Sequence, residues 1–280
     1  MERREVRHLL REAGIHPSKR LGQNFLVDAG VVGAIAEAIS RKSPEVVVEI
    51  GPGLGSVTDR LVEGAVPIIA VELDRRLAKR LGERLAGRDN VRIETADILR
   101  FDLASAIDGR RAYVFGSLPY RSTAPILRYL IEQRASIEGA LLITQREVAE
   151  KLTASPGKDG TALGVLVRAY AEVDVLRQIG RGSFEPSPEV ESTLWEMRFL
   201  EAPRFTCDTE TFFETARTLY GARRKMLRKA LQQLVARGAV EHVLAEAGIA
   251  GDVRGETLTF DELDRLAEAV AAVRSAEGDV

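Results

Sequence analysis

The chain has 280 residues, of which 45% are hydrophobic and 29% charged, and its 40 basic and 42 acidic side chains give a net charge of −2. This length suits one large and one small domain, and this composition argues against general disorder. A single cysteine, Cys207, excludes an intramolecular disulfide, and three histidines do not favour a zinc site. The chain has no apolar run of the roughly 20 residues that span a membrane and no secretory signal. We therefore expect a soluble cytoplasmic protein without a metal.

Short apolar runs alternate with amphipathic stretches over the first two hundred residues. Five of these runs are predicted to be strands, at residues 46–50, 68–71, 91–94, 112–115 and 139–143. The repeat of Leu73, Leu77, Leu81 and Leu85 predicts a helix after the second strand. Strands that alternate with helices indicate an α/β fold with a mainly parallel, doubly wound sheet.

The pattern turns helical after Pro203, which is predicted to separate an α/β domain at 1–203 from a small all-α domain at 204–280. Phe212, Ala216 and Leu219 share one helical face. A last helix is expected to begin at Thr259, because Thr259 and Glu262 have the spacing of a capping box.

The near-neutral net charge hides a local asymmetry. Residues 217–237 carry seven basic side chains and no acid, whereas residues 241–280 carry ten acids and three arginines. We predict that the first segment is a basic helix that binds a polyanion. The alternative is a helix face whose arginines are merely solvated.

The sequence Glu-Ile-Gly-Pro-Gly-Leu-Gly at 49–55 follows the first predicted strand. Glycines there let the backbone turn tightly and approach a ligand closely. Ser56 occupies the third glycine position of the dinucleotide fingerprint, so that motif is not matched. The pattern that remains, an acid followed by three alternating glycines, is typical of S-adenosylmethionine (SAM) methyltransferases. A plain strand–helix turn is the alternative.

Two further acids follow the next two strands. Glu72 ends the second strand, where a carboxylate can accept hydrogen bonds from both ribose hydroxyls of a nucleoside. Asp97 follows the third strand, where it can accept a hydrogen bond from an adenine amino group. The carboxyl ends of parallel strands meet at one edge of a sheet, so we predict a SAM site there.

The fourth strand leads into Ser117, Leu118, Pro119 and Tyr120. A polar residue followed by x-Pro-aromatic resembles the catalytic motif of amino-group methyltransferases. The N6 lone pair of adenine is delocalised into the ring, and acceptors for its two N–H groups would favour a nucleophilic, pyramidal nitrogen. An aromatic ring stacked on the extruded base would hold that nitrogen in place. The alternative is a Pro-Tyr turn without a catalytic role.

Together these motifs resemble the KsgA-type family of small-subunit ribosomal RNA adenine N6,N6-dimethyltransferases. Residues 19–28 (Lys-Arg-Leu-Gly-Gln-Asn-Phe-Leu-Val-Asp) are similar to the family's N-terminal cofactor motif, and the loop at 183–192 to its F-x-P-x-P-x-V-x-S motif. Residues 223–231 resemble its basic R-R-K-x-L-R motif. The resemblance covers almost the whole chain. It implies a Rossmann-like SAM-dependent methyltransferase domain at 1–203 and a helical RNA-binding domain at 204–280.

The resemblance also implies roles for single residues. The cofactor contacts would be Asn24, Leu26, Gly51, Gly53, Glu72, Asp97 and Ser117. The catalytic set would be Ser117, Leu118, Pro119, Tyr120 and Phe184, with Phe184 facing Tyr120 across the target adenine or, alternatively, only anchoring its loop. The RNA contacts would be Arg223, Arg224, Lys225, Arg228 and Lys229.

The implied activity is the dimethylation of two adjacent adenosines in a 3′-terminal hairpin loop of 16S ribosomal RNA. We expect the protein to act on an immature 30S particle, and to be a monomer because its predicted helices leave no apolar stripe uncovered. Ser117 departs from the family, which usually has asparagine at this position. Two alternatives stay open. One is a 23S ribosomal RNA adenine dimethylase of the antibiotic-resistance type. The other is a catalytically weak ribosome-assembly or transcription factor on the same fold.

Overall fold

The computed structural model describes residues 1–12, 14–18, 22–154 and 160–278. Lys19, Arg20 and Leu21, which begin the N-terminal motif, lie outside the described residues. Contacts divide the chain into two compact units. The first unit is Met1–Ala149 with Val173–Phe199, and the second is Glu150–Glu172 with Leu200–Val280. The division at Pro203 into separate domains stays a prediction.

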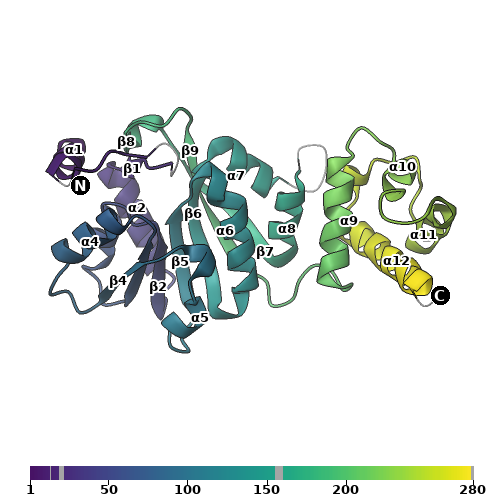
Figure 1. Cartoon of the computed structure of the whole chain (residues 1–280), viewed down its shortest axis with the longest axis horizontal. Coiled ribbons are helices and arrows are strands. Elements are labelled where there is room, and N and C mark those ends of the chain that lie inside the picture. Colours follow the sequence, from purple (N-terminus) through teal and green to yellow (C-terminus); the bar gives the residue numbers. More distant parts are fainter. Residues whose placement is uncertain (13, 19–21, 155–159, 279–280) are drawn as a thin grey trace. The chain divides into compact units, whose positions relative to one another are not determined.

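The first unit is built on a seven-stranded sheet with the order β4-β3-β2-β5-β6-β9-β7 (Figure 1). Its strands are β2 (Val46–Ile50), β3 (Ile68–Glu72), β4 (Val91–Thr95), β5 (Ala112–Ser117), β6 (Ile137–Gln145), β7 (Ala171–Ile179) and β9 (Ser192–Phe199). β4, β3, β2, β5 and β6 run parallel, and β9 is antiparallel to β6. The five predicted strands and the α/β class are thus confirmed.

Helices accompany the parallel strands, as such a sheet requires. They are α2 (Ala29–Ser40), α3 (Thr58–Leu61), α4 (Arg75–Arg84), α5 (Leu103–Ala106) and α6 (Tyr120–Glu132), with α1 (Arg3–Glu12) before them and the 3₁₀ helices η1 (Ile98–Arg100), η2 (Arg134–Ser136) and η3 (Arg181–Ser183) between strands. The predicted helix after β3 is confirmed as α4, in which Leu77 and Leu81 are buried. Leu73 does not belong to it, because Asp74 caps the helix and leaves Leu73 53% exposed.

A second, two-stranded sheet joins segments that are far apart in the sequence. β1 (Phe25–Leu26) pairs antiparallel with β8 (Phe184–Glu185). In its register Phe25 lies opposite Glu185, and Leu26 lies opposite Phe184. This pairing brings the N-terminal motif against the loop at 183–192.

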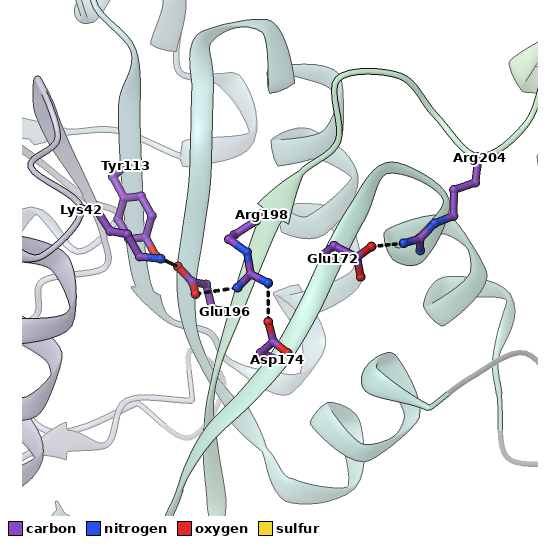
Figure 2. A network of polar contacts seen from close by, with 7 residues as sticks. All are labelled: Lys42, Tyr113, Glu172, Asp174, Glu196, Arg198 and Arg204. Atoms are coloured by element: carbon purple, nitrogen blue, oxygen red, sulfur yellow. Dashed lines mark hydrogen bonds and ion pairs between the residues drawn. The ribbon is translucent and has the colours of Figure 1, made fainter.

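A polar network ties together strands of the main sheet (Figure 2). The carboxylate of Glu196, on β9, accepts hydrogen bonds from the hydroxyl of Tyr113 at 2.5 Å and pairs with Lys42 at 2.5 Å and Arg198 at 2.9 Å. Arg198 also pairs with Asp174 of β7. Burial raises the pKa of Glu196, but the bonds from Lys42 and Tyr113 outweigh burial and leave the pKa lowered. The buried carboxylate is therefore held charged by its partners.

The second unit is helical, as predicted for the C-terminal part. Its helices are the end of α7 (Arg146–Thr153), α8 (Ala162–Tyr170), α9 (Thr209–Gly221), α10 (Leu227–Leu231), α11 (Val240–Ala247) and α12 (Phe260–Gly278), with the 3₁₀ helices η4 (Arg237–Ala239) and η5 (Gly255–Thr257) (Figure 1). Phe205 stacks on Phe212 with ring centroids 4.2 Å apart. The capping box at the start of α12 is confirmed, since Glu262 and Thr259 bond each other's backbone N–H.

The prediction of one basic helix over 217–237 is wrong. α9 ends at Gly221, and the chain turns before α10 begins at Leu227. Met226 has an extended backbone and forms an antiparallel bridge with Arg254. The basic side chains therefore lie on a helix end, a turn and a short helix.

Among the described residues, no helix is long and apolar enough to cross a membrane. They also contain no group of three or more His, Cys, Asp or Glu side chains that could hold a metal ion.

Candidate active site

A cavity of about 430 Å³ opens at the carboxyl edge of the sheet. This volume is within the range of small-molecule sites. Every residue expected to touch the cofactor or the target base lines this one cavity: Asn24, Leu26, Gly51, Gly53, Glu72, Asp97, Ser117, Leu118, Pro119, Tyr120 and Phe184. The strand order explains their meeting, because β4, β3, β2 and β5 are neighbours and all end at this edge.

The glycine turn after β2 forms one wall of the cavity. Gly51 and Gly53 have φ of 67° and 60°, values that L side chains rarely adopt. A Cβ on Gly53 would lie 3.0 Å from Cδ1 of Phe25, whereas one on Gly51 would meet nothing within 4 Å. The turn is thus packed behind Gly53 and open at Gly51, which fits a ligand that approaches the backbone closely.

Glu72 lines the cavity and is only 6% exposed. Its Oε2 accepts a hydrogen bond from the N–H of Gly53 at 2.9 Å, and its Oε1 accepts one from the N–H of Asp74 at 2.8 Å. Burial raises the pKa of Glu72, and these two bonds oppose that rise. A carboxylate oxygen has two lone pairs, so each oxygen keeps one for a ligand hydroxyl. The geometry fits the bidentate role predicted for Glu72.

Asp97 lines the cavity and also caps a short helix. Its Oδ1 accepts a hydrogen bond from the N–H of Leu99 at 3.0 Å and so caps η1. This contact fixes the carboxylate at the end of β4, where its other oxygen is available for a ligand amine. Asn24, in the N-terminal motif, donates to the carbonyl of Gly22 at 3.2 Å.

Glu49 lines the same cavity and is 2% exposed. Its Oε2 accepts a hydrogen bond from the hydroxyl of Thr58 at 2.7 Å. Burial raises the pKa of Glu49 to about 7, although the Thr58 bond lowers it, and repulsion from Asp59 and Glu72 adds to the rise. From the sequence alone Glu49 is only the first residue of the glycine motif. The raised pKa of Glu49 depends on tertiary burial.

The segment after β5 carries the predicted catalytic motif. Ser117 ends the strand, and the N–H of Leu118 donates to the carbonyl of Ile143 at 2.8 Å. Pro119 is the N-cap of α6, and the hydroxyl of Thr123 donates to its carbonyl at 3.0 Å. Tyr120 begins the helix and is 66% exposed. The backbone is thus held firmly while the ring of Tyr120 is open to a ligand.

Phe184 differs from Tyr120 in its burial. It is 2% exposed and packs in a core cluster with Leu26, Val31 and Leu194, among others, while still lining the cavity. Its burial fits a loop anchor, and its role facing Tyr120 across a target adenine stays a prediction.

Three exposed apolar residues of the cavity were not predicted from the sequence. Leu73, Leu99 and Val190 line it and are 53%, 41% and 45% exposed. Leu73 directly follows Glu72, and Leu99 lies two residues after Asp97. A large apolar side chain next to a strand-end acid was the signal that could have identified both, because exposed leucines there can cover the faces of a bound ring.

The basic residues of the second unit are not equivalent. Arg223 is partly buried, donates to the carbonyl of Gly160 and lies 5.5 Å from the ring centroid of Tyr220. Arg228 forms a two-bond ion pair with Glu241, at 2.6 and 3.2 Å. The exposed members of the predicted RNA-binding set also include Arg224, Lys225 and Lys229.

The chain is similar to known ribosomal RNA methyltransferases. A family model described as ribosomal RNA adenine dimethylase matches residues 16–272. The ribosomal RNA small subunit methyltransferase A of Moorella thermoacetica is 40% identical over 266 residues, covering 91% of this chain and 92% of that protein. The protein of the same name from Acidobacterium capsulatum is 39% identical over 259 residues, covering 91% of each chain.

Solved structures share the fold. The 23S rRNA methyltransferase ErmE is 27% identical, with a TM-score of 0.67 over 89% of this chain and 100% of that chain. A dimethyladenosine transferase from Plasmodium falciparum has a TM-score of 0.75 at 22% identity, over 86% of this chain and 95% of that chain. The Rossmann-like methyltransferase sheet expected from the sequence is thereby confirmed.

Proposed function

The chain belongs to the ribosomal RNA adenine dimethylase family, and we propose that it dimethylates N6 of two adjacent adenosines in a 3′-terminal hairpin loop of small-subunit ribosomal RNA. As a member of this family it is a SAM-dependent ribosomal RNA adenine methyltransferase. The choice of the small subunit is supported by relatives named for it, which are 39–40% identical over 91% of the chain. The observation that carries the proposal is the single cavity lined by both motif sets.

The cavity fits the cofactor that the family requires. SAM, when bound, supplies an electrophilic methyl group on a sulfonium centre. Glu72 would accept hydrogen bonds from the ribose hydroxyls, and Asp97 would accept one from the cofactor's adenine amine. Asn24, Leu26, Gly51 and Gly53 would complete the cofactor contacts, and the open backbone at Gly51 supports this role.

The target adenine would be held by the segment after β5. Tyr120 would stack on the extruded base, a contact worth about 1–3 kcal/mol. The hydroxyl oxygen of Ser117 and the carbonyl of Leu118 would accept hydrogen bonds from the two N6–H groups, which favours a nucleophilic nitrogen. Pro119 fixes the direction of this backbone, and Phe184 would bound the pocket on the side of β8.

No side chain needs to act as general base in this proposal. The amine becomes acidic only after it has reacted, and it can then lose its proton to water. The work of the protein is to orient the base and to place acceptors where positive charge develops on nitrogen. Ser117 offers acceptor lone pairs as asparagine would, from a shorter side chain.

The proposed partner is an immature 30S particle, bound by a monomer in the cytoplasm without a metal. Arg224, Lys225 and Lys229 are exposed and would contact RNA phosphates, which position RNA without reading its sequence. Arg223 and Arg228 have protein partners, so we propose that they mainly stabilise the local structure that carries the three exposed basic residues.

The alternatives are separated by one experiment. Purified protein is incubated with tritium-labelled SAM and undermethylated 30S or 50S particles, and label in each ribosomal RNA is counted. Label in 16S RNA alone is expected. Label in 23S RNA would favour the resistance-type enzyme, to which ErmE at 27% identity gives weaker support than the small-subunit relatives. Tight SAM binding without transfer would favour an assembly factor.

A further inference from the structure

The side chain of Glu185 is held by helix α1. It is 12% exposed, and its carboxylate pairs with Arg3 Nη1 at 3.0 Å and with Arg7 Nε at 2.8 Å. Arg7 Nη2 gives a third contact at 3.2 Å, and Arg3 Nη2 donates to the carbonyl of Gly182 at 2.6 Å. The hydrogen bond from Arg7 contributes most to a lowered pKa of Glu185. Two arginines thus converge on one carboxylate next to Phe184.

The face of α1 next to these two arginines is apolar and packs behind the cofactor wall. Val6 and Leu10 are 0% and 7% exposed and share a cluster with Phe25, Leu54 and Leu77. Those three side chains also line the cavity. Phe25 lies against Gly53 and, in the two-stranded sheet, directly opposite Glu185.

The start of the loop at 183–192 is also tied to the N-terminal segment through Ser183, two residues before Glu185. The N–H of Val27 donates to the carbonyl of Ser183 at 2.8 Å, and the hydroxyl of Ser183 donates to Asp28 at 2.9 Å. No residue of α1 takes part in these bonds. The loop can therefore keep its fold while α1 loses its anchor, which allows the role of α1 to be tested separately.

We propose that Arg3, Arg7 and Glu185 form a clamp that seats α1 behind the cavity, and that Glu185 is a positioning residue for cofactor binding. With α1 in place, Phe25, Leu54 and Leu77 stay packed as part of the wall that SAM contacts. Without it, α1 leaves its site, these three side chains lose their packing, and the wall loses its fixed shape. This inference rests on the proposed function, because it assigns the cavity to SAM.

The test uses the full-length protein and Glu185→Gln, which removes the charge and keeps the size. We expect the Kd for SAM by calorimetry and the KM for SAM to rise about 10-fold, within the range of typical coupling between sites. At saturating SAM we expect kcat to stay within about twofold. Arg4→Gln, a charge removal at an exposed position of the same helix, is the matched control and should leave the Kd for SAM unchanged.

Two measurements separate the clamp from a general loss of stability. In a double-mutant cycle, Arg7→Gln should add little to the Kd of the Glu185→Gln variant, because both remove one interaction. In hydrogen exchange, SAM should slow the amides of residues 3–12 in the wild type and much less in Glu185→Gln. An unchanged Kd in Glu185→Gln, or additive effects in the cycle, would overturn the clamp. A wild type that fails to bind SAM would overturn the proposed function itself.

Discussion

Leu26 and Phe184 lie directly opposite each other in the two-stranded sheet of β1 and β8. The first is expected to contact the cofactor, and the second is expected to bound the pocket of the target base. Both are less than 9% exposed, and both line the cavity. The four residues of this small sheet therefore link the expected cofactor site to the expected pocket of the target base. Because their backbones are paired, a shift of one strand would also shift the other.

Removing the hydroxyl of Ser117 should slow methyl transfer far more than it weakens cofactor binding, although Ser117 is also expected among the cofactor contacts. Ser117→Ala should lower kcat by about 10²–10³-fold, because it deletes one acceptor that acts on the reacting amine. The measurement is single-turnover transfer of labelled methyl to 30S particles, with the Kd for SAM as control. Ser117→Asn, which restores the residue usual in the family, should remain active. An unchanged rate in Ser117→Ala would remove the role assigned to this side chain.

The ring of Tyr120 should matter for the reaction and hardly at all for stability, since it is 66% exposed. Tyr120→Ala should lower kcat/KM for RNA by about 10- to 100-fold, which corresponds to the loss of one base-stacking contact. Tyr120→Phe keeps the stacking face and is the matched control. Equal losses in the two variants would show that the hydroxyl, rather than the ring, is what the enzyme needs.

A methyl group on Gly53 should disturb the cofactor wall. Gly53→Ala forces a side chain into a backbone with φ of 60° and brings a Cβ to 3.0 Å from Phe25. Gly109→Ala is the matched control, because φ there is 73° and nothing lies within 4 Å of the added atom. Both variants should lose about 1–2 kcal/mol of unfolding free energy. Only Gly53→Ala should weaken SAM binding, and equal affinities would contradict the close packing proposed for this turn.

Glu49 should make stability depend on pH below neutrality. Burial raises its pKa from 4.5 to about 7, so the folded protein keeps a proton that the unfolded chain loses between these values. The stability from this group is complete below pH 4.5 and is lost as the pH rises to about 7, a change of about 3 kcal/mol. Urea unfolding should show the stability of the wild type, relative to that of Glu49→Gln, falling by about 3 kcal/mol over this window and constant above it. A difference that is constant from pH 4.5 to 8 would contradict the raised pKa.

Exposed basic residues should contribute to RNA affinity more than those with protein partners. Each single replacement of Arg224, Lys225 or Lys229 by glutamine should make the salt dependence of RNA binding less steep. The slope of log K for RNA association against log salt concentration should fall in magnitude by about 1. Arg228→Gln is the comparison, because Glu241 already occupies its guanidinium, and its effect on the slope should be smaller. Filter binding to 16S RNA between 50 and 300 mM KCl, about the range over which phosphate contacts are screened, measures this. Equal slopes for Lys225→Gln and the wild type would exclude a phosphate contact there.

The parallel strands were predictable because their residues are apolar almost without interruption, as in Val46, Val47 and Val48, which are at most 1% exposed. The edge strand β7 was not predicted, because its residues 174–178 are exposed and mix charged with apolar side chains. β1 and β8 have two residues each, too few for any periodicity. Their pairing depends on contacts across about 160 positions, which a local pattern does not contain.

The site also combines features that a local sequence pattern predicts with features that depend on tertiary contacts. Glu72, Asp97 and Ser117 could be placed at one edge, because strand ends in a parallel sheet converge. The pairing of Arg228 with Glu241 and of Arg3 and Arg7 with Glu185 could not, since each depends on tertiary geometry. The break in the basic segment at Met226 also follows from a tertiary contact, the bridge to Arg254.

The most direct test of the central claim is mass spectrometry of nucleosides from 16S RNA after undermethylated 30S particles have been incubated with the protein and SAM. We predict N6,N6-dimethyladenosine in amounts approaching two per RNA, both in one hairpin near the 3′ end. Complete absence of methylated adenosine from 16S RNA, with active SAM binding, would contradict the assignment.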